Sequence, residues 1–345
     1  MYRKVSSVII IALMSALILA SSLIAQENVQ KEYNEKIRQA NELVVKMKQQ
    51  GISKEEYDKL NAQYQQLQKE IKALEEKLKA DVEYTKRINE AKIAFNEGNT
   101  AYKKGQYEVA VQYYEKSIKL NPNNPKVYYG KGLALNKLRR YDEAIASFRK
   151  AVEIDPNYDA AYSAIGLVYT SMRKYNEAIQ AYRKAVEIAP KRKITLYNLG
   201  LAYRRVKDYA NALKYFQMAT QVDPEYYKAF NSLGVTYFDM GKIDQAIMAF
   251  QNALAIKPDY SEALARLASA YNKIGKYKQA LDAAKQCLKK PGRYKGLANY
   301  EAGVAAKNLG NLDAALKYFQ AAARDRQWRK AAQYEIDLIM EKKRG

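Results

Sequence analysis

The sequence predicts an all-α protein, in which about seven copies of a paired-helix unit stack into a solenoid behind a coiled-coil helical hairpin. Three series of residues support this prediction, because each recurs at a step of 34 positions. They are Pro122, Pro156, Pro190, Pro224 and Pro258; Gly98, Gly132, Gly166, Gly200 and Gly234; and Ala110, Ala144, Ala178, Ala212 and Ala246. A fixed period of this size indicates one supersecondary unit whose copies bury their apolar faces on their neighbours.

The N-terminal residues 1–25 have the pattern of a secretory signal. Arg3 and Lys4 precede an uncharged run, Val5–Ala25, and small residues stand near its end. We therefore expect an exported protein, periplasmic or associated with the cell envelope if the source is bacterial. The alternative is an uncleaved membrane anchor, because about 20 apolar residues can span a bilayer. Contact with a membrane is expected only if this segment is retained.

Residues 26–90 carry two heptad seams among charged and amide residues. The first seam is Tyr33, Ile37, Ala40, Val44 and Met47; the second is Tyr57, Leu60, Tyr64, Leu67, Ile71, Leu74 and Leu78. Such spacing predicts coiled-coil helices. Between the seams, Gly51 can end one helix, and Ser53 with Glu56 can cap the next. The short turn favours an antiparallel hairpin, and the alternative is a homo-oligomer in which both seams meet other chains.

The periodic residues divide the chain from Ala91 onward into units. In each unit a first helix holds the glycine, a turn such as Gly105-Gln106-Tyr107 follows, and the second helix ends at the proline, which cannot donate a backbone N–H. The unit bounds are 91–124, 125–158, 159–192, 193–226, 227–260, 261–295 and 296–327. Residues 328–345 predict a capping helix around Trp328, followed by a basic tail.

The pattern resembles that of the tetratricopeptide repeat family. The fourth unit illustrates it with Leu199-Gly200, Tyr203, Tyr209, Ala212, Phe216, Ala219 and Pro224, and equivalents recur in the other units over residues 91–327. The resemblance implies a right-handed superhelix whose first helices line a concave groove that receives peptide segments. Cys287 occupies the place of Ala151, Ala185, Ala219 and Ala253, so we expect a small packed side chain.

The resemblance also implies which residues face the groove, since these recur near the second, fifth, sixth, ninth, twelfth and thirteenth places of a unit. The candidate peptide-binding residues are Asn96, Asn99, Tyr102, Lys103, Tyr129, Asn136, Lys137, Tyr197, Asn198, Arg204, Arg205, Asn231, Phe238, Asn272 and Lys273. Asparagine can pair with both polar groups of a peptide backbone, and the cations favour acidic partners. Leu133, Leu167, Leu201 and Val235 either reach the groove floor or pack between repeats.

Composition argues against catalysis. The 345 residues contain no histidine and one cysteine, which removes the commonest general base and excludes a thiolate metal cluster. No phosphate-binding motif or isolated carboxylate pair is present. We therefore expect a non-enzymatic protein with no cofactor and no metal site.

The net charge of +22 lies almost entirely in the repeats and their tail, because residues 26–90 are neutral and Arg3 with Lys4 supplies +2. The leading hypothesis is a scaffold of the cell envelope that binds a protein or peptide partner of acidic character. No nucleic-acid partner is expected for an exported chain. Two alternatives stay open: a polyanion binder that touches anionic lipid or nucleic acid through its basic surface, and a purely structural oligomeric spacer.

Overall fold

The computed structural model describes residues 27–44, 46–47, 52–289 and 292–344. They form helices and turns, and these described residues contain no strand. The predicted all-α solenoid of helix-turn-helix pairs is confirmed. The predicted leader, residues 1–25, and the predicted Gly51 helix end lie outside the described residues. No helix in the described ranges combines the length and the apolar character that a membrane crossing requires.

The chain forms two compact units. The first comprises residues up to Gly105 together with Gln112–Asn123, and the second comprises Gln106–Val111 with Asn124–Gly345. They do not divide the chain at residue 90, because the helix α2 (Lys54–Lys103) runs without a break from the predicted stalk into the first repeat.

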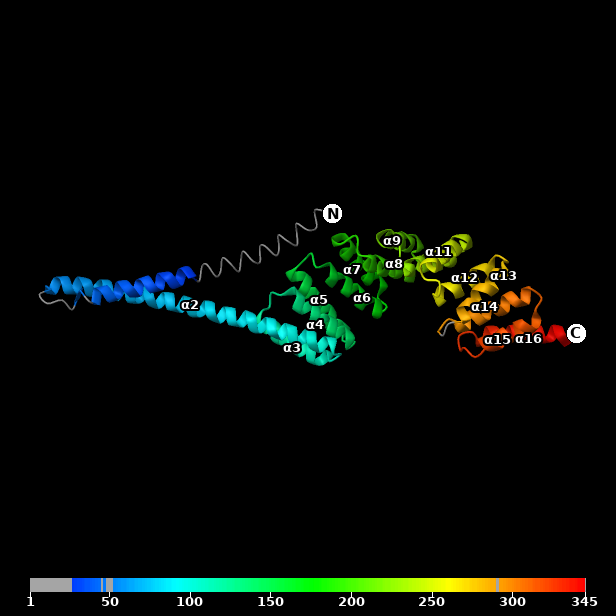
Figure 1. Ribbon diagram of the computed structural model, residues 1–345, viewed down its shortest axis with the longest axis horizontal. Helices are drawn as coiled ribbons and strands as arrows, with labels where there is room; N and C mark the ends of the chain where they lie inside the picture. The colour runs from blue at the N-terminus through cyan, green and yellow to red at the C-terminus, as the bar shows by residue number, and fades with distance from the viewer. Residues whose placement is uncertain (1–26, 45, 48–51, 290–291, 345) are drawn as a thin grey trace. The chain divides into compact units, whose positions relative to one another are not determined.

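In the first unit, residues 27–44 form a helix that lies antiparallel to α2 (Figure 1). The Tyr33 hydroxyl donates to a Glu75 carboxylate oxygen at 2.9 Å, and Lys36 pairs with Glu70 at 2.7 Å. Ser53 caps α2 by accepting from the backbone N–H of Glu56. The contact at the later residue of the first helix is made with the earlier residue of α2. The two helices therefore run antiparallel, as in the hairpin, and not parallel.

The first repeat pairs the end of α2 with α3 (Tyr107–Leu120). A Cβ atom on Gly98 would lie 2.7 Å from the Tyr114 ring, so only glycine allows the two helices to approach this closely. The Tyr114 hydroxyl donates to Asn99 at 2.8 Å, and the Ser117 hydroxyl donates to the Ala91 carbonyl at 2.8 Å. The repeat is thus held by a close helix contact and two buried or half-buried hydrogen bonds.

The second unit continues as successive helix pairs, which follow one another in chain order in Figure 1. They are α4 (Pro125–Lys137) and α5 (Tyr141–Ile154), α6 (Asp159–Ser171) and α7 (Tyr175–Ile188), α8 (Lys193–Arg205) and α9 (Tyr209–Val222), α10 (Tyr227–Asp239) and α11 (Ile243–Ile256), α12 (Ser261–Lys273) and α13 (Tyr277–Leu288), and α14 (Lys295–Asn308) and α15 (Leu312–Ala322). Four second helices of this unit end two residues before a periodic proline, as the missing N–H requires.

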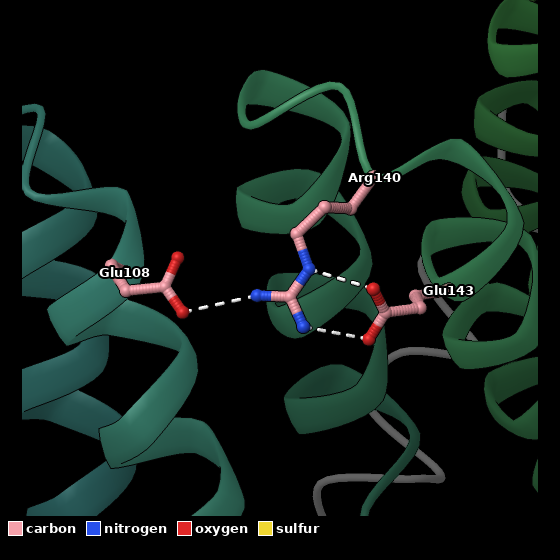
Figure 2. A network of polar contacts seen from close by, with 3 residues as sticks. All are labelled: Glu108, Arg140 and Glu143. Atoms are coloured by element: carbon pink, nitrogen blue, oxygen red, sulfur yellow. Dashed lines mark hydrogen bonds and ion pairs between the residues drawn. The ribbon is translucent and has the colours of Figure 1, made fainter.

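Neighbouring repeats are also joined by charge. Arg140 precedes α5 and reaches in two directions, as Figure 2 shows: its guanidinium makes a two-point contact with Glu143 at 2.7 Å and donates to Glu108 of the preceding repeat at 3.0 Å. The hydrogen bonds from Arg140 hold the pKa of Glu143 below its usual range. All three side chains are partly exposed, so this network contributes modestly to stability.

The final helix, α16 (Arg329–Arg344), covers the end of the last pair. Its buried Ala332 and Ile339 pack in one cluster with Phe319 of α15, and Trp328 and Ile336 pack against that cluster. Cys287 is buried in a neighbouring cluster, and burial raises the pKa of its thiol to about 11. The thiol is therefore an inert packed group at neutral pH.

Candidate functional site

Two hollows lie along the first helices of the second unit. The middle hollow, about 830 Å³, is lined by residues of α4, α6 and α8 and of the turns beside them. The C-terminal hollow, about 800 Å³, is lined by residues of α10, α12 and α14 and of the turns that precede α14 and α16. Both are large enough for several residues of a peptide.

The middle hollow has exposed aliphatic side chains in its lining. Ile194 is 60% exposed and Leu167 is 44% exposed, although both are large aliphatic side chains. Tyr129 forms one wall and is held by ring contacts with Phe148 at 5.6 Å and Tyr158 at 5.2 Å between centroids. Exposed apolar side chains beside aromatic and polar ones are typical of a ligand groove.

Two of the three cations that line the middle hollow form ion pairs. Lys193 forms an ion pair with Asp223, and the hydrogen bond from Lys193 lowers the pKa of that carboxyl. Arg192 donates to Asp159 at 3.1 Å. Because these pairs neutralise much of the rim, the middle hollow is better suited to apolar side chains than to acidic ones.

The C-terminal hollow combines aromatic area with positive charge. Phe238, Tyr294, Tyr300 and Trp328 supply rings, and the Tyr300 and Trp328 rings lie 5.0 Å apart between centroids. Its cations are Arg266, Lys273 and Arg293. Fixed rings beside cations can bind a peptide that carries aromatic or aliphatic side chains next to carboxylates.

Glu301 is the carboxylate that lines this hollow. One of its oxygens accepts from the Ser269 hydroxyl at 2.6 Å, and the other accepts from the Asn272 amide at 2.7 Å. Burial raises the pKa of Glu301, although these two hydrogen bonds and the charges of Lys273 and Arg266 act in the opposite direction. Each carboxylate oxygen thus accepts one hydrogen bond from the protein, and the carboxylate holds the Asn272 side chain in place.

The hollows bring together five of the fifteen predicted groove residues. Tyr129 and Asn198 line the middle hollow, and Phe238, Asn272 and Lys273 line the C-terminal hollow. The remaining ten predicted residues do not line either hollow, and their role as peptide contacts stays a prediction.

Several of those ten are engaged within the fold. Tyr197 lies between the Phe216 and Tyr226 rings, at 5.7 and 5.3 Å, and accepts from the Ser232 hydroxyl. Asn231 is only 4% exposed. Arg204 pairs with Asp239 at 3.3 Å.

The other members differ in exposure. Lys137 and Arg205 of the second unit and Asn96 and Lys103 of the first are exposed. Asn136, Asn99 and Tyr102 are half-buried, with Asn99 bonded to Tyr114.

For four aliphatic residues the sequence left two roles open, the groove or packing between repeats. The structure gives two of them to each role. Leu133 and Leu167 line the middle hollow. Leu201 packs against the core cluster around Phe216, and Val235 is buried in the cluster of the fifth and sixth repeats. The difference follows from how much neighbouring side chains fill the space, which the repeat register does not encode.

Sequence reasoning missed other residues that line the hollows. Tyr300 and Glu301 occupy the fifth and sixth places of the seventh unit, and Arg266 and Ile194 stand at the sixth and second places of theirs. The same positional rule could have found them. Trp328 lies beyond the repeats, so no register applies to it, and it both packs on the last repeat and lines the hollow.

Family models identify these repeats. Two models, both described as tetratricopeptide repeat, match residues 95–159 and residues 160–225 with 192–257. A third, described as the fifth ARM repeats domain of TT21, matches residues 233–340. The chain is a tetratricopeptide repeat protein. A comparison with curated proteins finds no match.

Solved structures share the fold. A tetratricopeptide repeat protein of Parabacteroides merdae ATCC 43184 is 16% identical, with 73% of this chain and 99% of that chain covered and a TM-score of 0.54. Pseudomonas aeruginosa PilF is 22% identical, with 63% and 97% covered and a TM-score of 0.53. A MamA fragment of Desulfovibrio magneticus RS-1 is 26% identical, with 50% and 97% covered and a TM-score of 0.47. The first two similarities establish the fold alone.

Tetratricopeptide repeat proteins are generally non-catalytic, and the repeats of this chain support a role as a protein-interaction scaffold.

Proposed function

We propose that the chain binds a segment of a partner protein along its first helices, with the C-terminal hollow as the principal site. The observation that carries this proposal is the convergence of Phe238, Asn272 and Lys273 on a hollow of about 800 Å³. These three residues come from two repeats, and Tyr300 and Trp328 add rings from the next elements. Rigid aromatic area beside polar groups provides affinity at a low cost in side-chain entropy.

The charges of the hollow favour an acidic segment. Arg266, Lys273 and Arg293 line it against the single carboxylate of Glu301, which Ser269 and Asn272 already satisfy. A partner carboxylate would therefore meet cations and little repulsion. The excess positive charge of the whole chain, +22, would speed the approach of such a partner.

A displayed library of random peptides, selected on the purified chain, tests this function. We expect enrichment of sequences that combine an aromatic residue with carboxylates. Lys273→Glu should weaken an enriched peptide by roughly tenfold or more, since it reverses a charge at the site. The matched control is Lys278→Glu, the same change on the exposed side of α13, which should leave affinity unchanged.

Two results would contradict the proposal. One is equal loss of affinity in the two variants. The other is binding that requires only net negative charge, disappears at physiological salt and extends to anionic lipid vesicles, which would favour the polyanion alternative instead.

We also propose that the scaffold acts outside the cytosol, in the cell envelope of a bacterial source. The support is the charge and hydropathy pattern of residues 1–25. Mass spectrometry of the N-terminus of the natural protein tests this proposal. A mature chain that begins near Gln26 would support export with cleavage, an intact leader in the membrane fraction would support an anchor, and an intact leader in the cytosol would contradict both.

A further inference from the structure

Helix α6 faces a third hollow, on the side opposite to the middle hollow. Ser163 and Leu167 line the middle hollow, whereas Tyr162, Ile165 and Tyr169 line a separate space of about 700 Å³. Successive residues of an α-helix are about 100° apart, so these two sets point in opposite directions. The second helices α5 and α7 form the other walls. We call this space the second-helix hollow.

One place in the lining of the second-helix hollow holds alanine, whereas the next repeat has tyrosine there. Ala181 of α7 lines it. At the same place one repeat later stands Tyr215, whose ring stacks on Tyr203 with centroids 5.5 Å apart and planes within 2°. Tyr203 is the repeat equivalent of Tyr169. The Tyr215 ring thus occupies, over Tyr203, the position that has no ring over Tyr169 one repeat earlier.

The same tyrosine–alanine pairing recurs in two later repeats, as Tyr237 with Ala249 and Tyr271 with Ala283. Tyr237 and Ala249 share a cluster into which Phe230 also packs. Tyr271, opposite Ala283, is 7% exposed and accepts from the Gln251 amide at 3.0 Å. Tyr271 is thus buried, whereas Tyr169 is half-buried and its hydroxyl accepts from a guanidinium instead of an amide.

Two arginines lie at the hollow beside the half-buried Tyr169 ring. The Arg149 guanidinium donates to the Tyr169 hydroxyl at 3.2 Å, and Arg183 lines the same hollow. Lys184, also at the hollow, is paired with Glu187 at 2.9 Å, while Glu177 completes the charged lining. The two arginines would attract a carboxylate placed next to an entering ring.

We propose that the second-helix hollow is a binding site for an aromatic side chain of a partner segment, flanked by an acidic residue. The ring stacks on Tyr169 above Ala181, as Tyr215 stacks on Tyr203, and the neighbouring carboxylate meets Arg149 and Arg183. The site goes beyond the proposed function, because it lies on a different side of the helix pair. It would let the scaffold hold a second partner, or a second segment of the same partner.

Methyl NMR on the full chain tests the site with capped tripeptides. The probe has tyrosine between two aspartates, and the controls have alanine between two aspartates and tyrosine between two lysines. We expect the probe alone to shift the methyl signals of Val152 and Ile165, which line the hollow, with a dissociation constant on the order of 1 mM for so small a ligand. The matched signals of Val186 and Leu199, their equivalents one repeat later, should not move.

Two substitutions make the prediction specific. Ala181→Tyr supplies the stacking ring from within, as in the next repeat, and should weaken probe binding by about tenfold or more. Tyr215→Ala should open a second hollow over Tyr203, so that the probe now shifts Val186 and Leu199. Unchanged methyl signals elsewhere in each variant will show that it is folded.

The proposal is overturned if the probe leaves Val152 and Ile165 unshifted, if the alanine control shifts them equally, or if Ala181→Tyr has no effect on a folded chain. Equal binding of the lysine-flanked peptide overturns the role of the arginines. Shifts confined to Leu297 and Val304 of the C-terminal hollow overturn this site while leaving the proposed function standing. Shifts at Val186 and Leu199 in Tyr215→Ala support the stacking mechanism directly.

Discussion

At the residue scale, each repeat balances a small residue in its first helix against a ring in its second. A Cβ atom on Gly200 would lie 2.7 Å from the Phe216 ring, and Gly132, Gly166, Gly234 and Gly303 show the same approach to their rings. The sixth repeat departs on both sides at once, because Ala268 stands opposite Ala284, and both are fully buried. The pair, rather than the glycine alone, is the unit that sets the distance between helices.

Gly200→Ala should therefore lower the free energy of unfolding by about 1–3 kcal/mol, as overpacking does in a dense core. Phe216→Ala should cost about 3–5 kcal/mol through the cavity it leaves. In the double variant the alanine at position 200 no longer meets a ring. The sum of the two single-variant losses in unfolding free energy should therefore exceed the loss in the double variant. Urea denaturation of the four proteins measures this coupling, and strict additivity would refute it.

Glu301 links stability to pH. Burial raises its pKa in the folded chain, so its contribution to stability is fully present below the unfolded pKa and is lost as pH rises through the folded value. Glu301→Gln, which stays neutral, should match the parent chain at pH 4 and exceed it in unfolding free energy by about 1 kcal/mol at pH 7.5. Denaturation at the two pH values provides the measurement.

The exposed Glu341→Gln is the control and should show no such difference between the two pH values. An equal effect of Glu301→Gln on the unfolding free energy at both pH values would mean that the effect comes from packing and not from ionisation.

At the element scale, the turn inside each pair requires a left-handed residue. Gly105, Gly241, Gly275 and Gly310 supply it with φ between 72° and 81°. Three other turns place Arg139, Arg173 and Lys207 in that conformation, at φ of 61°, 60° and 63°. A residue with a Cβ atom pays for this conformation with about 1–2 kcal/mol. These three turns are therefore strained positions in an otherwise regular array.

Replacing Arg139, Arg173 or Lys207 with glycine should raise the unfolding free energy by about 0.5–1 kcal/mol each, after the greater freedom of glycine in the unfolded chain is subtracted. Thermal unfolding would detect the sum of the three changes. Arg183→Gly, in the middle of α7, should instead destabilise the chain by about 1 kcal/mol. If the turn variants lose stability as well, the strain is relieved by contacts of the arginine and lysine side chains.

At the scale of the whole molecule, stability is the sum of contacts between neighbouring repeats. The last pair depends on α16, which buries Ala332 and Ile339 and brings Trp328 against it. Removing residues 328–345 should weaken α14 and α15 by about 2–4 kcal/mol, the scale of several large apolar groups returned to water. Because each repeat contacts only its neighbours, α4 and α5 should be unaffected.

Hydrogen exchange, followed helix by helix, measures both effects of this truncation. A shorter truncation of residues 343–345 serves as the control and should preserve protection in α14 and α15. Uniform loss of protection from α4 to α15 would contradict the additive view and indicate one cooperative unit.

Sequence alone determined the paired-helix solenoid and the register of its glycines and prolines, because a 34-residue period constrains every copy to the same backbone path. It also indicated Phe238, Asn272 and Lys273 as groove residues, since a side chain's direction on a helix follows from its place in the repeat. Only the tertiary structure decided which of these positions stay open: Asn231 is buried, Ile194 is exposed, and Ala181 leaves vacant the space that Tyr215 fills one repeat later. The physical reason is that a hollow depends on the volumes of all side chains that meet there from several helices, whereas the register specifies one chain position at a time.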